Sequence, residues 1–342
     1  MAKSPVSAQS SDPNSTYTTG GRPPIDPFKE PIPWLEAFWQ FSRPHTIIGT
    51  SLSAVALLAI ALAAHLAATP SPLNWGLIIS SWMLAWIACL CGNVYIVGLN
   101  QVEDIAIDRI NKPYLPIASG EFTKKQGQRL VWLMGAGAIA LSLISQNIFL
   151  ILTVVLSLII GTAYSMPPVR LKRFPFWASM CILVVRGAIV NLGLYLYFST
   201  QLGLGVVVPA RVWALMLFVL VFSFAIAIFK DIPDLEGDRQ FNISTYTLQL
   251  GQKKVFNLAR WVLTACYGGL IVSAPFLPGV NAPFLMVTHG LGILSFWWLS
   301  RRVDLDSAPV KKDISYPTFY QFIWKLFFVE YLIFPLACWL AQ

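Results

Sequence analysis

The sequence carries little charge. Only 12% of its 342 residues are Asp, Glu, Lys or Arg, whereas 56% are hydrophobic. A soluble domain usually contains about 25% charged residues. One globular core cannot bury this much apolar surface, so the composition excludes a soluble protein. We predict an integral membrane protein whose apolar surface is solvated by the lipid bilayer.

Cysteine and histidine are also scarce, with five and three residues. All five cysteines fall in apolar runs, and Cys89-x-Cys91 does not have the spacing of a zinc site. His65 and His289 have no ligand-like spacing to other residues. We interpret the cysteines as small buried hydrophobic residues, so the sequence indicates neither a thiolate metal centre nor a redox function.

Apolar runs of about 20 residues, the length that crosses a bilayer, recur along the whole chain. They predict an all-α polytopic protein with nine membrane spans around a central cavity. The predicted spans are 46–68, 75–99, 127–145, 148–165, 177–198, 207–229, 255–277, 284–300 and 319–341. The junctions near residues 146 and 280 are short, which is typical of antiparallel helix hairpins.

The net charge of +8 lies mostly on one side of the predicted membrane. If the N-terminus lies on side one, that side receives 21 of the 24 Lys and Arg residues and 15 of the 16 acids. This positive-inside pattern predicts a cytoplasmic N-terminus and a C-terminus on the opposite side. It accounts for the basic charge without a nucleic-acid partner.

Residues 1–33 are rich in Ser, Thr, Pro and Gly and contain no apolar core. We expect a disordered tail there rather than a secretory signal. Its acids argue against a plastid transit peptide. The membrane domain is predicted to be 34–342.

An acidic sequence occurs twice, 130 residues apart (234 − 104). The two copies are Asp104-Ile-Ala-Ile-Asp108-Arg109 and Asp234-Leu-Glu-Gly-Asp238-Arg239. Each copy closes a predicted span, the second and the sixth. We therefore predict that spans 1–4 and 5–8 are related, parallel halves, with the ninth span added.

Polar residues extend both copies upstream. Asn100, Asp104 and Asp108 are spaced i, i+4 and i+8, which places them on one helix face over ~12 Å. Asp231, Asp234 and Asp238 are spaced i, i+3 and i+7, and Pro233 is expected to unwind the start of that stretch.

These could be ordinary solvated loop acids, but two copies in register at span ends favour a site. Carboxylates crowded at a membrane boundary repel one another, and divalent cations relieve that repulsion. Oxygen ligands without His or Cys favour magnesium. We predict that all six side chains bind metal and that the aspartates Asp104, Asp108, Asp234 and Asp238 are catalytic.

Basic residues lie beside the acidic copies and after the fourth span. Lys and Arg near magnesium carboxylates are typical of polyphosphate sites, although each is equally explained as a topology-setting charge. These residues are Arg109, Lys112, Arg170, Lys172, Arg173, Lys230 and Arg239. Arg186 lies deep in the fifth span, where a lone guanidinium is costly, so we expect an acidic or phosphate-binding cavity around it.

Other polar residues in or near spans are less specific. His45 in Ser42-Arg43-Pro44-His45-Thr46 is either a helix-start residue or a substrate contact. Lys325 and Glu330 are five residues apart, too far for an ideal pair on one helix face. We predict a structural role for both through other helices.

The motif Asn100-x-x-x-Asp104-x-x-x-Asp108 with Asp231-x-x-Asp234-x-x-x-Asp238 resembles the paired aspartate motifs of UbiA-type intramembrane prenyltransferases. Longer strings resemble the homogentisate prenyltransferases within that family, over nearly all of residues 34–342. These strings are Phe41-Ser-Arg-Pro-His-Thr-Ile-Ile-Gly-Thr50, Asn93-Val-Tyr-Ile-Val-Gly-Leu-Asn100, Asn111-Lys-Pro-Tyr-Leu-Pro116 and Phe229-Lys-Asp-Ile-Pro-Asp234.

The resemblance implies that two magnesium ions bind the diphosphate of phytyl diphosphate, and that the allylic cation is attacked by homogentisate. Carbon dioxide and a proton then leave, giving 2-methyl-6-phytyl-1,4-benzoquinol for tocopherol synthesis. It also implies that Tyr164 and the Pro167-Pro168 loop lie near the diphosphate, in a cyanobacterial thylakoid or plasma membrane. The full set of expected substrate-binding residues is Arg43, His45, Lys112, Tyr164, Lys172, Arg173, Arg186 and Lys230.

Two alternatives remain open at this point. Internal duplication and membrane acids also occur in cation transporters, although transporters place such acids near the bilayer midplane. A related prenyltransferase with another donor or acceptor, such as geranylgeranyl diphosphate, solanesyl diphosphate or a chlorophyll precursor, would have the same metal site.

Overall fold

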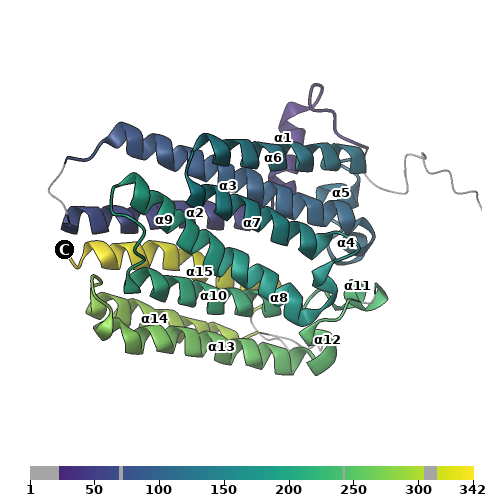
Figure 1. Cartoon of the computed structure of the whole chain (residues 1–342). Coiled ribbons are helices and arrows are strands. Elements are labelled where there is room, and N and C mark those ends of the chain that lie inside the picture. The colour runs from purple at the N-terminus through teal and green to yellow at the C-terminus, as the bar shows by residue number, and fades with distance from the viewer. Residues whose placement is uncertain (1–22, 69–71, 242, 304–313) are drawn as a thin grey trace, which may run out of the picture.

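The structure is a computed structural model that describes residues 23–68, 72–241, 243–303 and 314–342. Within these ranges the chain is helical, apart from an isolated bridge between Val303 and Ile314. The long helices run side by side in one bundle (Figure 1). Nine helical segments of the described chain are long and apolar enough to cross a membrane. The predictions of an all-α fold and nine spans are confirmed.

The span 148–165 has the predicted bounds, and the other spans differ from the predicted runs by at most four residues at either end. The spans are α2 (Pro44–Ala68), α3 (Trp75–Glu103), α6 (Lys124–Ile144), α7 (Ile148–Ser165), the composite helix Pro175–Gln201, α10 (Ala210–Lys230), the segment Gln252–Phe276, α14 (Ala282–Ser300) and α15 (Tyr316–Trp339). The composite helix consists of α8 (Pro175–Leu183), the π-helical turn η2 (Val184–Ile189) and α9 (Val190–Gln201). The segment Gln252–Phe276 consists of α13 (Gln252–Ser273) and the 3-10 turn η3 (Ala274–Phe276).

Short helices precede the first span or connect later spans on the side of the acidic segments. They are α1 (Pro31–Phe41), α4 (Ile105–Asn111), α5 (Pro116–Ser119), the 3-10 turn η1 (Leu171–Arg173), α11 (Leu235–Gln240) and α12 (Tyr246–Leu250).

The two predicted tight junctions are helix hairpins, and asparagine begins the second helix of each. Asn147 accepts a hydrogen bond from the backbone N–H of Phe149 at the start of α7. Asn281 does the same for Phe284 at the start of α14. Each cap satisfies a backbone donor that the helix itself cannot pair.

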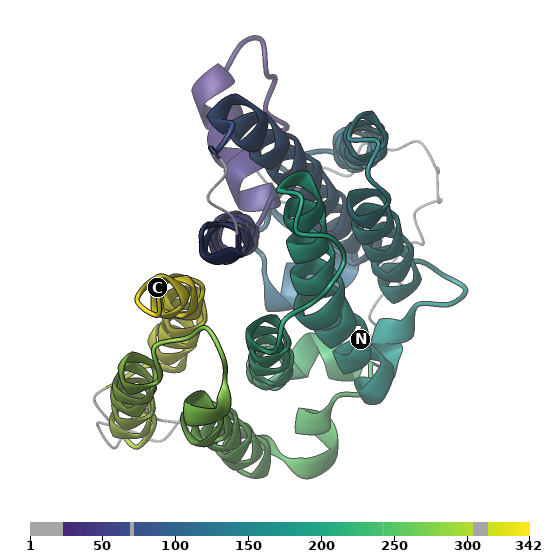
Figure 2. The same cartoon turned by 60° about the vertical axis from the view of Figure 1, so that its left-hand side comes forward.

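The packing agrees with a duplicated arrangement. The helix that follows each acidic segment packs back along the helix that leads into it, α6 on α3 and α13 on α10, and these are the two most extensive helix pairs. The added helix α15 packs on α2 and on α10, so it joins the end of the chain to its beginning (Figure 2).

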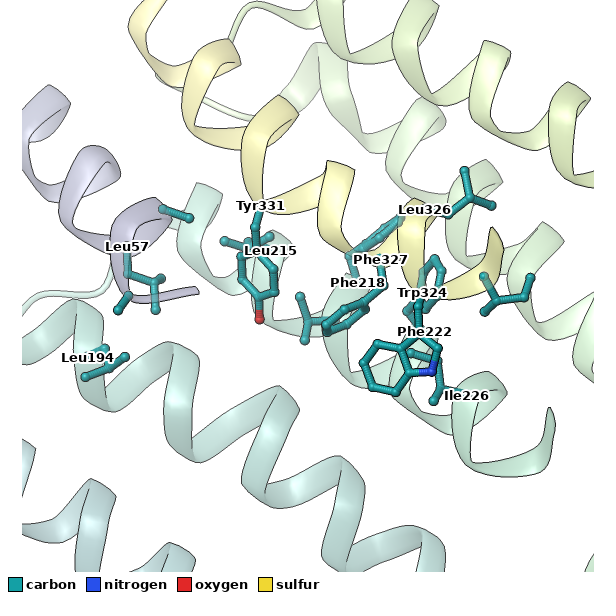
Figure 3. Close-up of a cluster of buried hydrophobic side chains, with 14 of the residues drawn as sticks. Leu57, Leu194, Leu215, Phe218, Phe222, Ile226, Trp324, Leu326, Phe327 and Tyr331 are labelled. Atoms are coloured by element: carbon teal, nitrogen blue, oxygen red, sulfur yellow. The ribbon is translucent and has the colours of Figure 1, made fainter. Parts of the chain in front are cut away.

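Aromatic side chains fill the space between α10 and α15 (Figure 3). Phe222 and Phe327 have ring centroids 5.5 Å apart, and Phe327 is as close to Tyr331. Such rings supply the close van der Waals packing on which helix association in a membrane depends. This core fixes the face of α15 that turns toward the functional residues.

Ordered structure begins before residue 34. The N–H of Ile25 donates to the carbonyl oxygen of Glu121 over 2.9 Å, and helix α1 begins at Pro31. The predicted boundary between tail and membrane domain therefore falls inside α1. The expectation of disorder for residues 1–22 lies outside the described residues.

Candidate functional site

A cavity of about 300 Å³ lies inside the helix bundle. Thirteen of the fourteen predicted site residues line it. They are Arg43, His45, Asn100, Asp104, Asp108, Lys112, Tyr164, Lys172, Arg186, Lys230, Asp231, Asp234 and Asp238. The two acidic segments, 130 residues apart in sequence, thus share one cavity.

Both acidic segments have the same helix–break–helix form. Helix α3 ends at Glu103, Asp104 adopts a non-helical backbone (φ −110°, ψ 18°), and α4 begins at the next residue. Helix α10 ends at Lys230, Asp234 has a similar backbone (φ −85°, ψ 10°), and α11 follows. The predicted break near Pro233 is confirmed.

On one continuous helix Asn100, Asp104 and Asp108 would lie on one face, but the helix is interrupted at Asp104. The chain nevertheless stays compact across the break. The N–H of Asp104 donates to the carbonyl oxygen of Asn100 (3.0 Å), and the N–H of Asp108 donates to that of Asp104 (2.8 Å). The three side chains therefore still line one cavity.

Asn111, at the end of α4, ties the two segments together. Its Nδ2 donates to the carbonyl oxygen of Asp234 over 3.0 Å, and its Oδ1 accepts from the N–H of Gly237 over 2.9 Å. Gly237 approaches so closely that a Cβ there would lie 2.5 Å from Asn111 Oδ1. Sequence reasoning did not assign this role to Asn111, because nothing local distinguishes a bridging asparagine from a loop residue.

Lysine and arginine side chains pair with the aspartates. Lys112 Nζ lies 2.5 Å from Asp234 Oδ2, which is a contact between the two halves. Asp104 accepts from Lys172 and, over 2.8 Å, from Arg170. The sequence marked Arg170 only as one of three basic residues after the fourth span, and its contact with Asp104 went unpredicted. The mouth of the cavity is a network of alternating charges.

The residues of this network fit a divalent cation. The side chains that converge on the cavity offer carboxylate and amide oxygens. Asp108 Oδ2 is buried and has no hydrogen-bond partner, and such an oxygen is costly without a positive neighbour. In the described part of the chain, no three His, Cys, Asp or Glu residues form a ready metal cluster. Lys112 pairs with Asp234 there, and Lys172 pairs with Asp104.

Burial makes the charged forms of these groups costly. It raises the pKa of Asp108 to about 6, against the opposing effect of Arg43 and Lys112. Burial likewise raises the pKa of Asp238 to about 7, against the opposing effect of Lys230. It lowers the pKa of Lys112, which the neighbouring Asp234 partly offsets. Additional positive charge at the carboxylates would stabilise their ionised state.

Arg43 reaches the first acidic segment from the junction of α1 and α2. Its backbone is left-handed (φ 53°), which is uncommon outside glycine and is found preferentially at functional sites. One guanidinium nitrogen lies 3.4 Å from Asn100 Oδ1, and Asn100 Nδ2 donates to Asp104 over 2.9 Å. His45 lies against the ring of Trp324, with centroids 4.6 Å apart.

Arg173 does not line the cavity, in contrast to the prediction. It follows Lys172 in the short 3-10 turn η1, where successive side chains point about 120° apart. Lys172 is buried toward Asp104, so Arg173 is exposed. Arg109 and Arg239, the arginines of the repeated sequence, are exposed as well.

Arg186 lines the cavity as expected, but its nearest neighbours are aromatic. Its guanidinium carbon lies 4.9 Å from the ring centroid of Trp324 and 5.6 Å from that of Phe327. Glu330 makes the predicted contact with another helix, since its Oε2 lies 2.9 Å from His289 Nε2 on α14.

Comparison with known proteins decides the family. The UbiA prenyltransferase family model matches residues 57–326. The homogentisate phytyltransferase of Synechocystis sp. is 51% identical over 313 residues, which cover 90% of this chain and 97% of that protein. The chain belongs to the UbiA prenyltransferase family. The homogentisate solanesyltransferase of Arabidopsis thaliana is 38% identical over 301 residues, covering 87% of this chain and 76% of that protein.

Solved structures agree with this fold. A UbiA homolog from Archaeoglobus fulgidus bound to GPP and Mg2+ superposes with a TM-score of 0.58 at 16% identity, covering 87% of this chain and 99% of that chain. A UbiA homolog from Aeropyrum pernix superposes with a TM-score of 0.60 at 18% identity, covering 86% and 96%. The UbiA protein described here is therefore a multi-pass membrane enzyme of the prenyltransferase class, which disfavours the transporter alternative.

Proposed function

We propose that this UbiA protein transfers the phytyl group of phytyl diphosphate to homogentisate with loss of carbon dioxide, giving 2-methyl-6-phytyl-1,4-benzoquinol for tocopherol synthesis. The observation that carries the proposal is the 51% identity to a homogentisate phytyltransferase over nearly the full length of both chains. The shared cavity of the two acidic segments supports it, because a diphosphate donor needs such a charged binding site.

We infer that magnesium binds between the two acidic segments. Hard oxygen ligands and the unpaired Asp108 Oδ2 support this choice. When bound, magnesium supplies the positive charge that neutralises the departing diphosphate. The residues that would hold it are Asn100, Asp104, Asp108, Asp231, Asp234 and Asp238.

The cations of the cavity are placed to bind the diphosphate itself. Lys230 lies 3.0 Å from Asp231 and 4.0 Å from Asp234, so its ammonium group is already held at the acidic segments. Lys112 and Lys172 are held there in the same way. The oxygens of a bound polyphosphate would accept hydrogen bonds from these ammonium groups, and the carboxylates with which the lysines now pair would hold the magnesium. Tyr164 lines the same cavity, close enough to Lys230 and Asp231 for their charges to act on its hydroxyl group.

The rest of the cavity is suited to an allylic cation. When the bond between C1 of the phytyl group and oxygen breaks, the electron pair leaves with the diphosphate. The apolar side chains of Ile96, Val154 and Ile226 line the cavity and limit the access of water, which would hydrolyse the cation. A ring carbon of homogentisate then forms the new bond to C1, and the ring loses a proton. The side-chain carboxylate leaves as carbon dioxide, and the remaining CH2 carbon takes up a proton to become the methyl group.

The acidic segments lie on the side of the membrane that carries most of the Lys and Arg residues. We infer that the site opens on the cytoplasmic face, in accordance with the positive-inside pattern. The similarity to a cyanobacterial protein supports a thylakoid or plasma membrane location.

The proposal is tested with membranes that contain the protein, magnesium, radiolabelled homogentisate and one prenyl diphosphate at a time. We expect labelled prenylquinol with phytyl diphosphate, at a higher kcat/KM than with geranylgeranyl or solanesyl diphosphate. Preference for solanesyl diphosphate would assign the donor of the Arabidopsis relative instead. If no donor gives labelled product, the proposal that homogentisate is the acceptor is refuted. Membranes carrying the Asp104→Ala variant are the matched control.

A further inference from the structure

Arg186 differs from the other cations of the cavity because those cations contact the acidic segments. Arg43, which has no ion pair in the described residues either, lies 3.4 Å from Asn100. Lys112, Lys172 and Lys230 each pair with an aspartate of the acidic segments. Within the described residues, no acidic side chain pairs with the Arg186 guanidinium, and its electrostatic neighbours are the hydroxyls of Tyr320 and Tyr331. A half-buried guanidinium that lines a cavity within a membrane span and has no anionic partner indicates a ligand that brings one.

The backbone holds Arg186 in a defined position. The residue lies in the π-helical turn η2, a feature that occurs often at functional sites. Asn191 Nδ2 donates to the carbonyl oxygens of Arg186 and Gly187, both over 2.8 Å, and Tyr331 donates to Asn191 Oδ1 over 3.2 Å. Gly187 packs directly against the Leu220 backbone, since a Cβ there would lie 2.7 Å from the Leu220 Cα. The irregular turn is therefore locked by its neighbours.

Aromatic side chains lie between Arg186 and the acidic segments. The Trp324 ring contacts Arg186 on one side, with 4.9 Å to the guanidinium carbon, and His45 on another, with ring centroids 4.6 Å apart. Tyr320 is in the electrostatic range of Arg186 and also of Lys230 and Asp234. All of these residues line the cavity. One end of this region thus carries a free guanidinium and the other end carries the diphosphate site.

We infer that the guanidinium of Arg186 binds the carboxylate of the aromatic acceptor, with the acceptor ring held among His45, Tyr320 and Trp324. This inference rests on the proposed function, which supplies an acidic aromatic acceptor. A guanidinium pairs with a carboxylate through two parallel hydrogen bonds, so it fixes the orientation of the ring as well as its position. An acceptor without the carboxylate leaves the Arg186 cation in the cavity unpaired, and this difference would select for the acid.

The test compares two acceptors that differ only in the carboxylate, homogentisate and methylhydroquinone. In the Arg186→Gln variant we expect the KM for homogentisate to rise about 10- to 100-fold, the loss typical of a charged hydrogen-bonded contact. The KM for phytyl diphosphate and the turnover of methylhydroquinone should change less than about threefold, because neither compound offers a carboxylate to Arg186. A rise in the KM for phytyl diphosphate alone would overturn the inference and place Arg186 at the diphosphate.

Arg211→Gln is the matched control, because Arg211 lies on the opposite side of the membrane and binds the carbonyl oxygen of Gly279. It should alter neither KM. Arg186→Lys keeps the charge but loses the planar fork, and we expect a smaller rise in the KM for homogentisate. If the glutamine variant does not fold, the lysine variant tests whether Arg186 binds the carboxylate. An unchanged KM for homogentisate in the lysine variant would then overturn the inference.

Equilibrium binding separates this inference from the proposed function. Binding of homogentisate to the detergent-solubilised protein is measured by calorimetry without donor or magnesium. We expect wild type to bind homogentisate more tightly than methylhydroquinone and Arg186→Gln to lose that difference. If wild type binds homogentisate in this way but forms no product, the proposed reaction fails while the carboxylate site stands. Equal binding of both compounds to wild type refutes the carboxylate site alone.

Discussion

Asn111 offers the sharpest test of whether the two acidic segments act as one site. Asn111→Ala removes two hydrogen bonds between α4 and α11, to the carbonyl oxygen of Asp234 and from the N–H of Gly237. Gly237 is buried, so its N–H loses its partner without full access to water. An unsatisfied buried group costs about 1–3 kcal/mol. We therefore expect about 2–3 kcal/mol less free energy holding the segments together.

Magnesium and diphosphate bind only when both segments are in place. In the Asn111→Ala variant, part of their binding free energy is therefore used to bring the segments together, and their apparent affinity falls by the same amount. At about 1.4 kcal/mol for each factor of ten, the half-saturating magnesium concentration should rise roughly 30- to 150-fold. The assay measures labelled product against magnesium concentration at saturating phytyl diphosphate and homogentisate. The maximal rate at high magnesium should recover most of the wild-type value.

Asn147→Ala is the control for general destabilisation. Asn147 caps α7 at the opposite end of the bundle and donates to Thr200 over 2.9 Å, so it also makes two hydrogen bonds. It should lower the melting temperature of the purified protein without shifting the magnesium dependence. A magnesium dependence of Asn111→Ala equal to that of wild type, with a lower melting temperature, would show that Asn111 only supports the fold.

Three further predictions address individual charges. Asp104→Ala and Asp234→Ala should each abolish turnover but leave membrane insertion intact, since insertion depends on the apolar spans, whereas the melting temperature should fall because Lys172 or Lys112 loses its ion-pair partner; near-normal activity in either would contradict a shared site. Because the pKa of metal-free Asp238 is raised to about 7, this carboxyl is protonated below that pH, and magnesium competes with the proton. The half-saturating magnesium concentration should therefore rise as the pH falls from 8 to 6, and a flat profile would argue against this carboxylate as a ligand. Lys172→Ala should reduce kcat/KM for phytyl diphosphate at least tenfold, whereas Arg173→Ala should change it less than about twofold, because only Lys172 reaches the cavity; equal losses would show that the exposed arginine also contacts the donor.

The sequence allowed the spans and the location of the acidic segments to be predicted because both depend on local information. The length of an apolar run determines whether a helix crosses the bilayer. Helix α10 ends one residue after its predicted run, at Lys230, and α3 ends four residues after its own, at Glu103. Positions that depend on the surrounding fold were harder. Asp104 breaks its helix without a neighbouring proline or glycine, and two basic side chains from another loop pair with it there.

The other features that the sequence did not predict also depend on the surrounding fold. A π-helical turn around Arg186 leaves no mark on hydropathy, since the residues of the composite helix are apolar on both sides of it. Lys172 and Arg173 are equivalent in composition, and only the 3-10 turn decides which of them faces the cavity. The bridging role of Asn111 depends on α11, which lies more than 120 residues further along the chain.

The two copies of the acidic sequence are alike in form but differ in the source of their partners. Asp104 in the first copy pairs with Arg170 and Lys172, which belong to the same half of the chain. Asp234 in the second copy lies 4.0 Å from Lys230 of its own half, but its shorter ion pair is with Lys112 of the first half, and Asn111 of that half binds its backbone. The first half therefore organises its own segment and also positions the second one. Duplication alone would have produced two separate acidic ends, whereas these contacts from α4 and the residue that follows it make a single binding site from both.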